Sequence, residues 1–127
     1  MNALPRKPWA EVWKDVLAVV ERLRETGIKT LCKGNLNDIL EVKADHITVM
    51  SQKPLRGRPR PRLLKEEDFR YVWERLIKKG EIHTLREIPK VRGRRAVICA
   101  ILSHLPYIEG YCEKRKLILK LNFKNEL

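Results

Sequence analysis

The segment from Gln52 to Leu64 constrains the fold of this chain more than any other, because it cannot form the interior of a helix. Its sequence, Gln-Lys-Pro-Leu-Arg-Gly-Arg-Pro-Arg-Pro-Arg-Leu-Leu, contains three prolines and a glycine. Each proline removes a backbone donor and disfavours helical geometry in the residue before it. We therefore expect an extended basic arm or loop over residues 52–65. It separates residues 1–51 from residues 66–127, and a chain of 127 residues fits one compact domain overall.

The N-terminal region, residues 1–51, changes its apolar period along its length. Apolar residues first recur every three or four positions, which predicts a helix of about residues 8–26 that ends at Gly27. Over residues 40–43 and 47–49, apolar and polar residues then alternate. Alternation of this kind on both sides of a polar turn is typical of a β-hairpin.

The C-terminal region, residues 66–127, has the element order of a winged helix-turn-helix. The expected elements are a helix over 66–79 ended by Gly80, a short strand at Glu81–His83, a short helix opened by the capping-box spacing of Thr84 and Glu87 and closed by Pro89, a helix over 93–105 stopped by Pro106, and a hairpin that pairs 107–111 with 117–123. The fold class expected is therefore α+β, with the N-terminal helix and β-hairpin packed on a winged-helix-like unit.

Positive charge is concentrated beyond the first 51 residues. The chain has a formal net charge of +12, but residues 1–51 hold 8 Lys or Arg against 7 Asp or Glu, a net of +1. Residues 52–127 hold 20 against 9, a net of +11. This asymmetry favours a surface that faces a polyanion, with duplex DNA as the expected partner, over a basic composition that only keeps the protein in solution.

The cysteines and the hydropathy pattern predict a reduced, cytoplasmic protein. The three cysteines are an odd number, and no apolar N-terminal segment resembles a signal peptide or a membrane span. No helix has the basic face and bulky apolar face of a membrane-surface anchor, so no membrane partner is expected. Cys32 and Cys99 are expected to pack as small hydrophobic residues. Charged residues make up 35% of the chain, with a single glutamine, which is a thermophile-like composition.

Two groups of cations lie where a winged helix contacts DNA, at the start of its recognition helix in the major groove and on its wing. They are Arg92, Arg94 and Arg95 before and at the start of the third helix, and Lys114, Arg115 and Lys116 at the tip of the wing. A helix N-terminus also attracts phosphate through its free N–H groups. The alternative is a solvated helix start in which Arg95 pairs with Glu87, and lysines at a hairpin tip are common without a function.

The arm contains a third basic group. Arg56-Gly-Arg58-Pro59 matches the core of the AT-hook, a short minor-groove-binding motif, and Arg60 and Arg62 continue its alternation. Glycine allows a close approach to the groove floor and proline keeps the segment extended, while arginines suit the negative potential of a narrow A·T-rich groove. An AT-hook-like insertion, general phosphate contact and a solvated loop all remain open for this arm.

The aromatic residues divide between the core and the surface. Trp9, Trp13, Phe69 and Trp73 fall on the predicted apolar stripes and are expected in the core. Tyr107 and Tyr111 lie on the predicted wing and are the candidates for stacking on bases.

Metal and cofactor sites are not expected. The three histidines and three cysteines show no paired spacing that would hold zinc. Glu41-Val-Lys43 resembles the acid-x-Lys element of the PD-(D/E)XK nucleases, which would imply a Mg²⁺-dependent reaction that uses Glu41 and Lys43. Asp38 lies only three residues before Glu41, too close for the separated acid of that family. Nuclease activity is therefore a minor alternative, and the chain is not expected to be an enzyme.

A longer resemblance covers residues from about Leu31 to Leu121. Its residues are Leu31-Cys-Lys-Gly-Asn35, Ile39-Leu-Glu-Val42, Ile47-Thr-Val49, Asp68-Phe69 with Trp73-x-x-Leu76, and Arg94-Arg-Ala-Val-Ile-Cys-Ala-Ile-Leu-Ser-His-Leu-Pro106. This stretch resembles an uncharacterised prokaryotic domain associated with restriction and other DNA-defence proteins. The resemblance implies a DNA-associated accessory module with no activity of its own. Tyr107 stands where that domain has glycine, so a different turn into the wing is expected.

These observations together predict a nucleic-acid-binding accessory or regulatory protein that acts mainly through phosphate contacts. The alternative is a protein–protein interaction or dimerisation module of a larger DNA-processing complex, because winged folds also serve as docking platforms.

Overall fold

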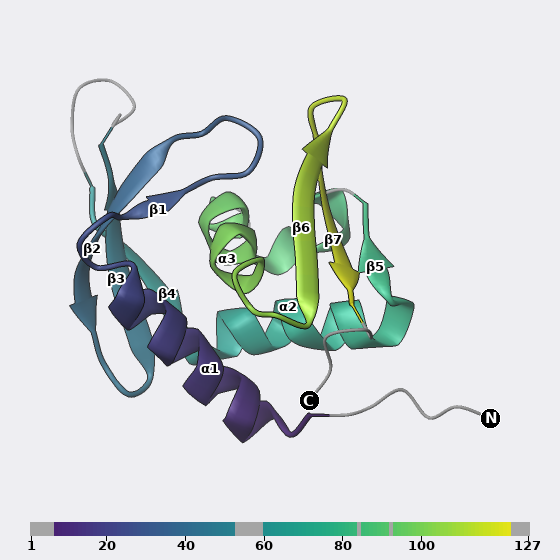
Figure 1. Cartoon of the computed structure of the whole chain (residues 1–127), viewed down its shortest axis with the longest axis horizontal. Helices are drawn as coiled ribbons and strands as arrows, with labels where there is room; N and C mark the ends of the chain where they lie inside the picture. The colour runs from purple at the N-terminus through teal and green to yellow at the C-terminus, as the bar shows by residue number, and fades with distance from the viewer. Residues whose placement is uncertain (1–6, 53–59, 84, 92, 123–127) are drawn as a thin grey trace.

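The chain folds as α+β, as predicted. The computed structural model describes residues 7–52, 60–83, 85–91 and 93–122. Over these residues it has three α-helices, two short 3-10 helices and two antiparallel sheets (Figure 1). No helix in these ranges is long and apolar enough to cross a membrane.

The first helix, α1 (Trp9–Arg22), buries one apolar stripe. Its buried residues are Val12, Trp13, Val16, Val19 and Val20, at the three- and four-residue spacing seen in the sequence. The helix ends at Arg22 instead of continuing to residue 26, and a turn leads from it to Gly27, whose φ of +82° is a left-handed conformation. Gly27 donates its N–H to the Leu23 carbonyl at 2.7 Å, which closes this turn.

The N-terminal sheet has four strands in the order β1-β2-β3-β4, namely β1 (Ile28–Lys29), β2 (Leu36–Val42), β3 (His46–Ser51) and β4 (Arg62–Lys65). The predicted hairpin is confirmed as β2 and β3, with a bulge between Ile39 and Glu41. The prediction of an arm or loop up to residue 65 is wrong for its last four residues. Arg62–Lys65 pairs with β3 because Leu64 buries its side chain opposite Ile47 on the core face.

The C-terminal part follows the predicted order of elements. These are α2 (Glu66–Lys79), β5 (Glu81–Ile82), the 3-10 helices η2 (Leu85–Glu87) and η3 (Pro89–Val91), α3 (Arg95–Leu102), β6 (Ile108–Glu113) and β7 (Lys116–Leu121). The strands form a three-stranded sheet in the order β5-β7-β6. Pro89 begins η3 instead of closing the short helix, since proline is tolerated in a first helical turn. Thr84, the first residue of the predicted capping box, lies outside the described residues.

The two parts of the chain share one apolar core. Helix α3 contacts α1, β1 and β6, so it lies between the N-terminal elements and the C-terminal hairpin β6–β7 (Figure 1). Two indole groups fasten α1 in place. Trp9 donates to Glu66 at 2.9 Å and Trp13 donates to the Ala44 carbonyl at 2.7 Å. Buried residues from both parts form a single hydrophobic cluster.

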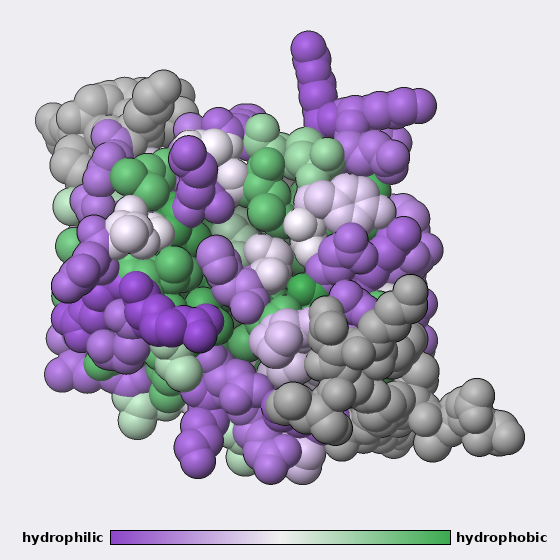
Figure 2. Space-filling view, viewed as in Figure 1, coloured by the Kyte–Doolittle hydropathy of each residue, from purple (hydrophilic) through white to green (hydrophobic). Residues whose placement is uncertain are grey.

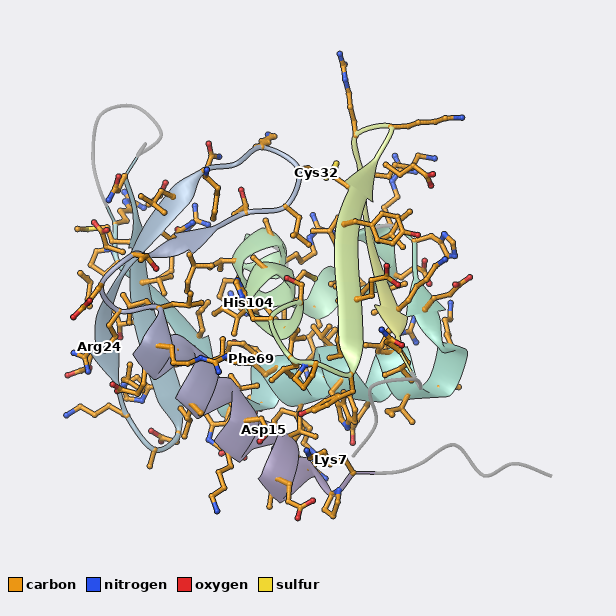
Figure 3. The ribbon with its side chains drawn as sticks, viewed as in Figure 1. Lys7, Asp15, Arg24, Cys32, Phe69 and His104 are labelled. Atoms are coloured by element: carbon orange, nitrogen blue, oxygen red, sulfur yellow. A yellow bond between two sulfur atoms is a disulfide. The ribbon has the colours of Figure 1, made fainter. Side chains whose placement is uncertain are left out.

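The cysteines differ from the prediction in two respects, because two of them are oxidised to a disulfide and Cys32 is exposed. Cys32, in the loop between β1 and β2, forms a disulfide with Cys112 on β6 (Figure 3). Both residues are exposed, so the expectation that Cys32 packs as a small hydrophobic residue is wrong. Cys99 is buried and free, as predicted, and burial raises the pKa of its thiol to about 12.

Candidate nucleic-acid interface

The basic cluster Arg92, Arg94 and Arg95 lies at the start of α3, where the buried carboxylate of Asp68 contacts the starts of two helices. Asp68 accepts the Lys65 N–H at 3.2 Å at the start of α2 and the Arg94 Nε–H at 3.3 Å from the residue that precedes α3. Arg94 is therefore in part a structural residue. Arg95 is half-buried at the first position of α3. Arg92 lies outside the described residues.

The Glu87 carboxylate, the suggested partner of Arg95, binds groups on two neighbouring elements. Glu87 accepts the His83 backbone N–H at 2.9 Å and binds the Lys79 ammonium at 3.0 Å. The hydrogen bond from His83 is the main cause that lowers the pKa of Glu87, and partial burial opposes it. Glu87 thus joins the 3-10 helix η2 to the residue after β5 and to the end of α2.

The arm and the start of α3 meet at one hydrogen bond. Arg62, the first residue of β4, donates from its guanidinium to the Gly93 carbonyl at 2.7 Å. This contact exists because Arg62 pairs with Val49 on the core side of the sheet, from which its long side chain extends toward α3. Arg60, two residues earlier, is exposed and has no ion-pair partner among the described residues. Arg56 and Arg58 lie outside those residues, so the AT-hook-like motif stays a prediction.

The basic cluster at the hairpin tip consists of Lys114, Arg115 and Lys116. Lys114 and Arg115 form a two-residue turn with φ of 50° and 67°, both in the left-handed region. Such turns favour asparagine and glycine, and a left-handed residue of another type costs roughly 1–2 kcal/mol. All three side chains are exposed, and hydrophilic side chains project from this tip in Figure 2. Strain that is kept at an exposed cationic turn points to a function for the cations.

Helix α3 cannot enter a groove of DNA in this structure. Its residues Val97, Ile98, Cys99, Ala100, Ile101 and Leu102 each expose 2% of their surface or less. Since α1, β1 and β6 contact the helix, the face that a recognition helix would offer to bases is covered. The expected entry of this helix into the major groove is therefore wrong for the fold described. Only Arg95 and Ala96, at its N-terminal end, are partly exposed.

The predicted core aromatic residues are buried except Trp9, which is only partly buried against the core. Trp13, Phe69 and Trp73 are buried. Tyr107 is also buried and donates its hydroxyl to Asp15 at 2.7 Å, so it cannot stack on a base. It was expected on the wing surface, but it lies in the turn before β6 and packs its ring edge-on against Trp73. Tyr111 is half-buried on β6, with the Lys120 ammonium 5.7 Å from its ring centroid.

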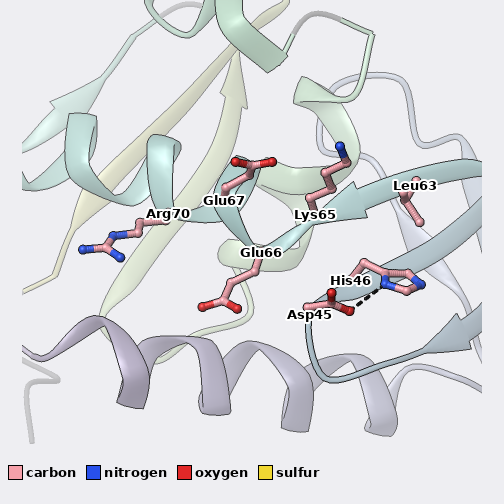
Figure 4. A pocket seen from close by; sticks show the side chains of 7 residues that line it. All are labelled: Asp45, His46, Leu63, Lys65, Glu66, Glu67 and Arg70. Carbon is pink, nitrogen blue, oxygen red and sulfur yellow. Dashed lines mark hydrogen bonds and ion pairs between the residues drawn. The ribbon is translucent and has the colours of Figure 1, made fainter.

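A shallow pocket of about 400 Å³ lies at the other end of β4, where β3 begins and α2 starts (Figure 4). Its lining residues are Asp45, His46, Leu63, Lys65, Glu66, Glu67 and Arg70. Three carboxylates against two cations make this lining a poor site for phosphate. The His46 ring lies 2.8 Å from the Asp45 carboxylate, so part of the polar lining is already paired. The pocket is not part of the basic surface.

The residues of the minor nuclease alternative lie close together on the N-terminal sheet. The Lys43 ammonium is 3.6 Å from the Glu41 carboxylate, whose other oxygen is 3.6 Å from the His46 ring. The bulge brings Asp38 and Glu41 to the same face, because their partners Met50 and Thr48 are two residues apart on β3. Across the described ranges, however, no group of three or more His, Cys, Asp or Glu side chains is arranged to hold a metal ion.

The sequence did not indicate that the loop between β1 and β2 carries exposed lysines close to the C-terminal hairpin. Lys29 and Lys33 are exposed on either side of Leu31, and the disulfide at Cys32 carries this loop to β6. An odd count of three cysteines shows neither that two of them pair nor which two. Searches of protein-family models, curated proteins and solved structures found no match for this chain.

Proposed function

We propose that the protein binds nucleic acid, with duplex DNA as the favoured form, and acts as an accessory or regulatory protein through phosphate contacts. The observation that carries this proposal is the contact of Arg62 with Gly93, which joins the basic arm to the start of α3. The exposed cations Arg60, Lys114, Arg115 and Lys116 have no ion-pair partner among the described residues. Exposed cations of this kind are suited to contacts with phosphate.

The buried α3 makes the proposal more specific. Because α3 cannot reach base edges, the affinity in this proposal comes mainly from phosphate neutralisation and the accompanying release of counterions. The order of elements from α2 to β7 supports a winged-helix-like unit, and the sequence resemblance supports a place in a restriction or DNA-defence system. In such a system this chain would hold DNA while a partner protein acts on it.

A cytoplasmic location is part of the same proposal, and the disulfide limits the kind of organism in which that location is expected. Disulfides are rare in the cytosol of mesophiles, but intracellular proteins of hyperthermophiles are rich in them. The thermophile-like composition and the Cys32–Cys112 disulfide therefore agree with each other. No cofactor and no membrane partner are included in the proposed function.

An anisotropy titration tests the proposal with a short fluorescein-labelled duplex, a single strand and an RNA of matched length. We expect binding at low salt, tightest for the duplex, and a linear fall of log K with log salt concentration. Absence of binding to all three probes at low salt would overturn the proposal.

A pair of charge-matched variants locates the surface. Reversal of Lys114, Arg115 and Lys116 to glutamate is expected to weaken binding at least ~10-fold, because three phosphate contacts are lost. The control reverses Lys14, Arg22 and Lys78, exposed cations of α1 and α2, and has the same net charge. It should bind within about threefold of the wild type. Equal losses in the two variants would show that only net charge matters.

A protein–protein module is the second candidate, and a specific surface supports it. Leu40 and Leu63 are 43% and 44% exposed on the N-terminal sheet, and Leu63 pairs with Thr48 on the face away from the core. Replacing both leucines with serine should abolish partner binding in this alternative and leave DNA binding intact. The reversed hairpin tip should have the opposite effects.

The nuclease alternative is supported by the proximity of Glu41, Lys43 and His46. It predicts Mg²⁺-dependent nicking of supercoiled plasmid that Glu41→Ala abolishes. Intact plasmid after incubation with the wild type and Mg²⁺ removes it.

A further inference from the structure

The loop between β1 and β2, residues 30–35, is fastened to the C-terminal hairpin at two points. The Cys32–Cys112 disulfide holds the two Cα atoms 5.1 Å apart. Next to it, Leu31 packs over Gly110: its Cδ1 lies 3.1 Å from the place that a Cβ on Gly110 would occupy. The loop consequently lies beside the upper part of β6, with the labelled Cys32 near that strand (Figures 1 and 3).

This attachment brings two sets of cations together. Lys33 follows Cys32, and Lys114 lies two residues beyond Cys112. With about 3.8 Å between consecutive Cα atoms and 5.1 Å between those of the two cysteines, the Cα atoms of Lys33 and Lys114 are at most roughly 17 Å apart. One strand of duplex DNA carries a phosphate every 3.4 Å along the helix axis, so this span covers roughly four to five phosphates.

The cations of the loop are available for contact. Lys29 and Lys33 are exposed, and neither has an ion-pair partner among the described residues. The acidic side chain closest in sequence to the hairpin tip is Glu113, whose Cα pairs with that of Lys116 across the hairpin. No ion pair joins these two side chains in the part of the chain that the structure describes. The loop therefore extends the unpaired positive surface of the hairpin tip.

We infer that the β1–β2 loop is a further phosphate-binding element, and that the Cys32–Cys112 disulfide joins it to the hairpin tip to form a two-loop clamp on the nucleic-acid backbone. Lys33 is its central contact residue. This inference rests on the proposed function and adds to it the dependence of affinity on the redox state of the protein. Without the disulfide, the loop loses its covalent attachment to β6, and the position of Lys33 relative to Lys114 is no longer fixed.

The test is a salt titration of duplex binding for Lys33→Gln, the disulfide-free variant Cys32→Ser/Cys112→Ser, and the combination of the three substitutions. Lys33→Gln should reduce the slope of log K against log salt by about 0.9, the value for one lost phosphate contact. Lys14→Gln, which removes an exposed lysine from α1, is the matched control and should leave the slope unchanged. Lys33→Gln keeps the disulfide and changes only an exposed side chain, so it is expected to fold.

The combined variant separates a positioning role of the disulfide from general damage. If the disulfide positions Lys33, then Lys33→Gln has no further effect on the slope once the disulfide is absent, and the two changes are not additive. The clamp is overturned if the two effects are additive or if Lys33→Gln leaves the slope unchanged. The proposed function still holds in that case, provided that the wild type binds and that reversal of the hairpin tip abolishes binding. If the wild type does not bind at low salt, the proposed function itself fails.

Discussion

Removal of the Cys32–Cys112 disulfide is predicted to destabilise the fold strongly, because the bond closes a loop of 80 residues. Cross-linking two residues restricts the unfolded chain by an entropy of about −2.1 − 1.5R ln n cal/mol/K. For n of 80 this amounts to about 4.5 kcal/mol at 25 °C. Domains of this size have a total stability of roughly 5–15 kcal/mol, so the bond accounts for a large share of it.

The assay is thermal unfolding of Cys32→Ser/Cys112→Ser beside the wild type, with and without dithiothreitol. The reagent transfers two hydrogens to the disulfide and becomes a cyclic disulfide itself. With an unfolding entropy of roughly 2.1 cal/mol/K per residue, the predicted loss lowers Tm by about 17 °C. Reduced wild type should match the variant, and the variant should not respond to the reagent. A wild type with a verified disulfide that unfolds within about 3 °C of the variant refutes the reasoning.

Three further predictions concern single sites. Oxidised protein should give no thiol titre when native and one equivalent when unfolded, because Cys99 is buried and is the free cysteine; a native titre of two or more contradicts the disulfide. Gly110→Ala should destabilise by about 1–3 kcal/mol in denaturant titrations, since its Cβ would lie 2.5 Å from that of Ser103, whereas Glu109→Ala on the same strand should change stability by less than about 0.5 kcal/mol. Glu87→Gln should cost about 1 kcal/mol at neutral pH. Because the folded pKa of Glu87 is lowered, that difference is present above the ordinary value of 4.5 and disappears as the pH falls through the folded pKa; a difference that persists at low pH contradicts this cause.

Sequence reasoning predicted the bounds of α2 correctly and made α1 and α3 too long. Helix α2 begins and ends where expected, because its apolar spacing is interrupted at Gly80, which has the left-handed φ of +81°. The strand β4 was missed for a physical reason. Arg62–Lys65 follows prolines and has one buried side chain, Leu64, so its pairing depends on a partner strand that the local sequence does not specify.

The candidate site was predictable in composition and only in part in geometry. The exposure of the hairpin-tip cations follows from a polar turn between alternating strands, and the structure agrees. The burial of Tyr107 depends on Asp15, which is 92 residues away in the sequence. The attachment of Lys33 to the hairpin likewise depends on a cysteine pair separated by 80 residues. Contacts over such distances leave no periodic signal in one sequence.

For the proposed binding of DNA, the coverage of α3 decides which kind of recognition is energetically open. To offer the helix to a groove, α1 and β1 would have to separate from it and expose side chains such as Ile98 and Leu102, which are fully buried. Stripping each of these costs roughly 1.5–3 kcal/mol, so even two of them cost about 3–6 kcal/mol. A good bidentate base contact contributes roughly 1–3 kcal/mol. Opening therefore costs more than a base contact returns, and the disulfide between the N-terminal part and β6 opposes it further. Recognition through the phosphate backbone requires no such opening, because the exposed cations lie outside the covered helix.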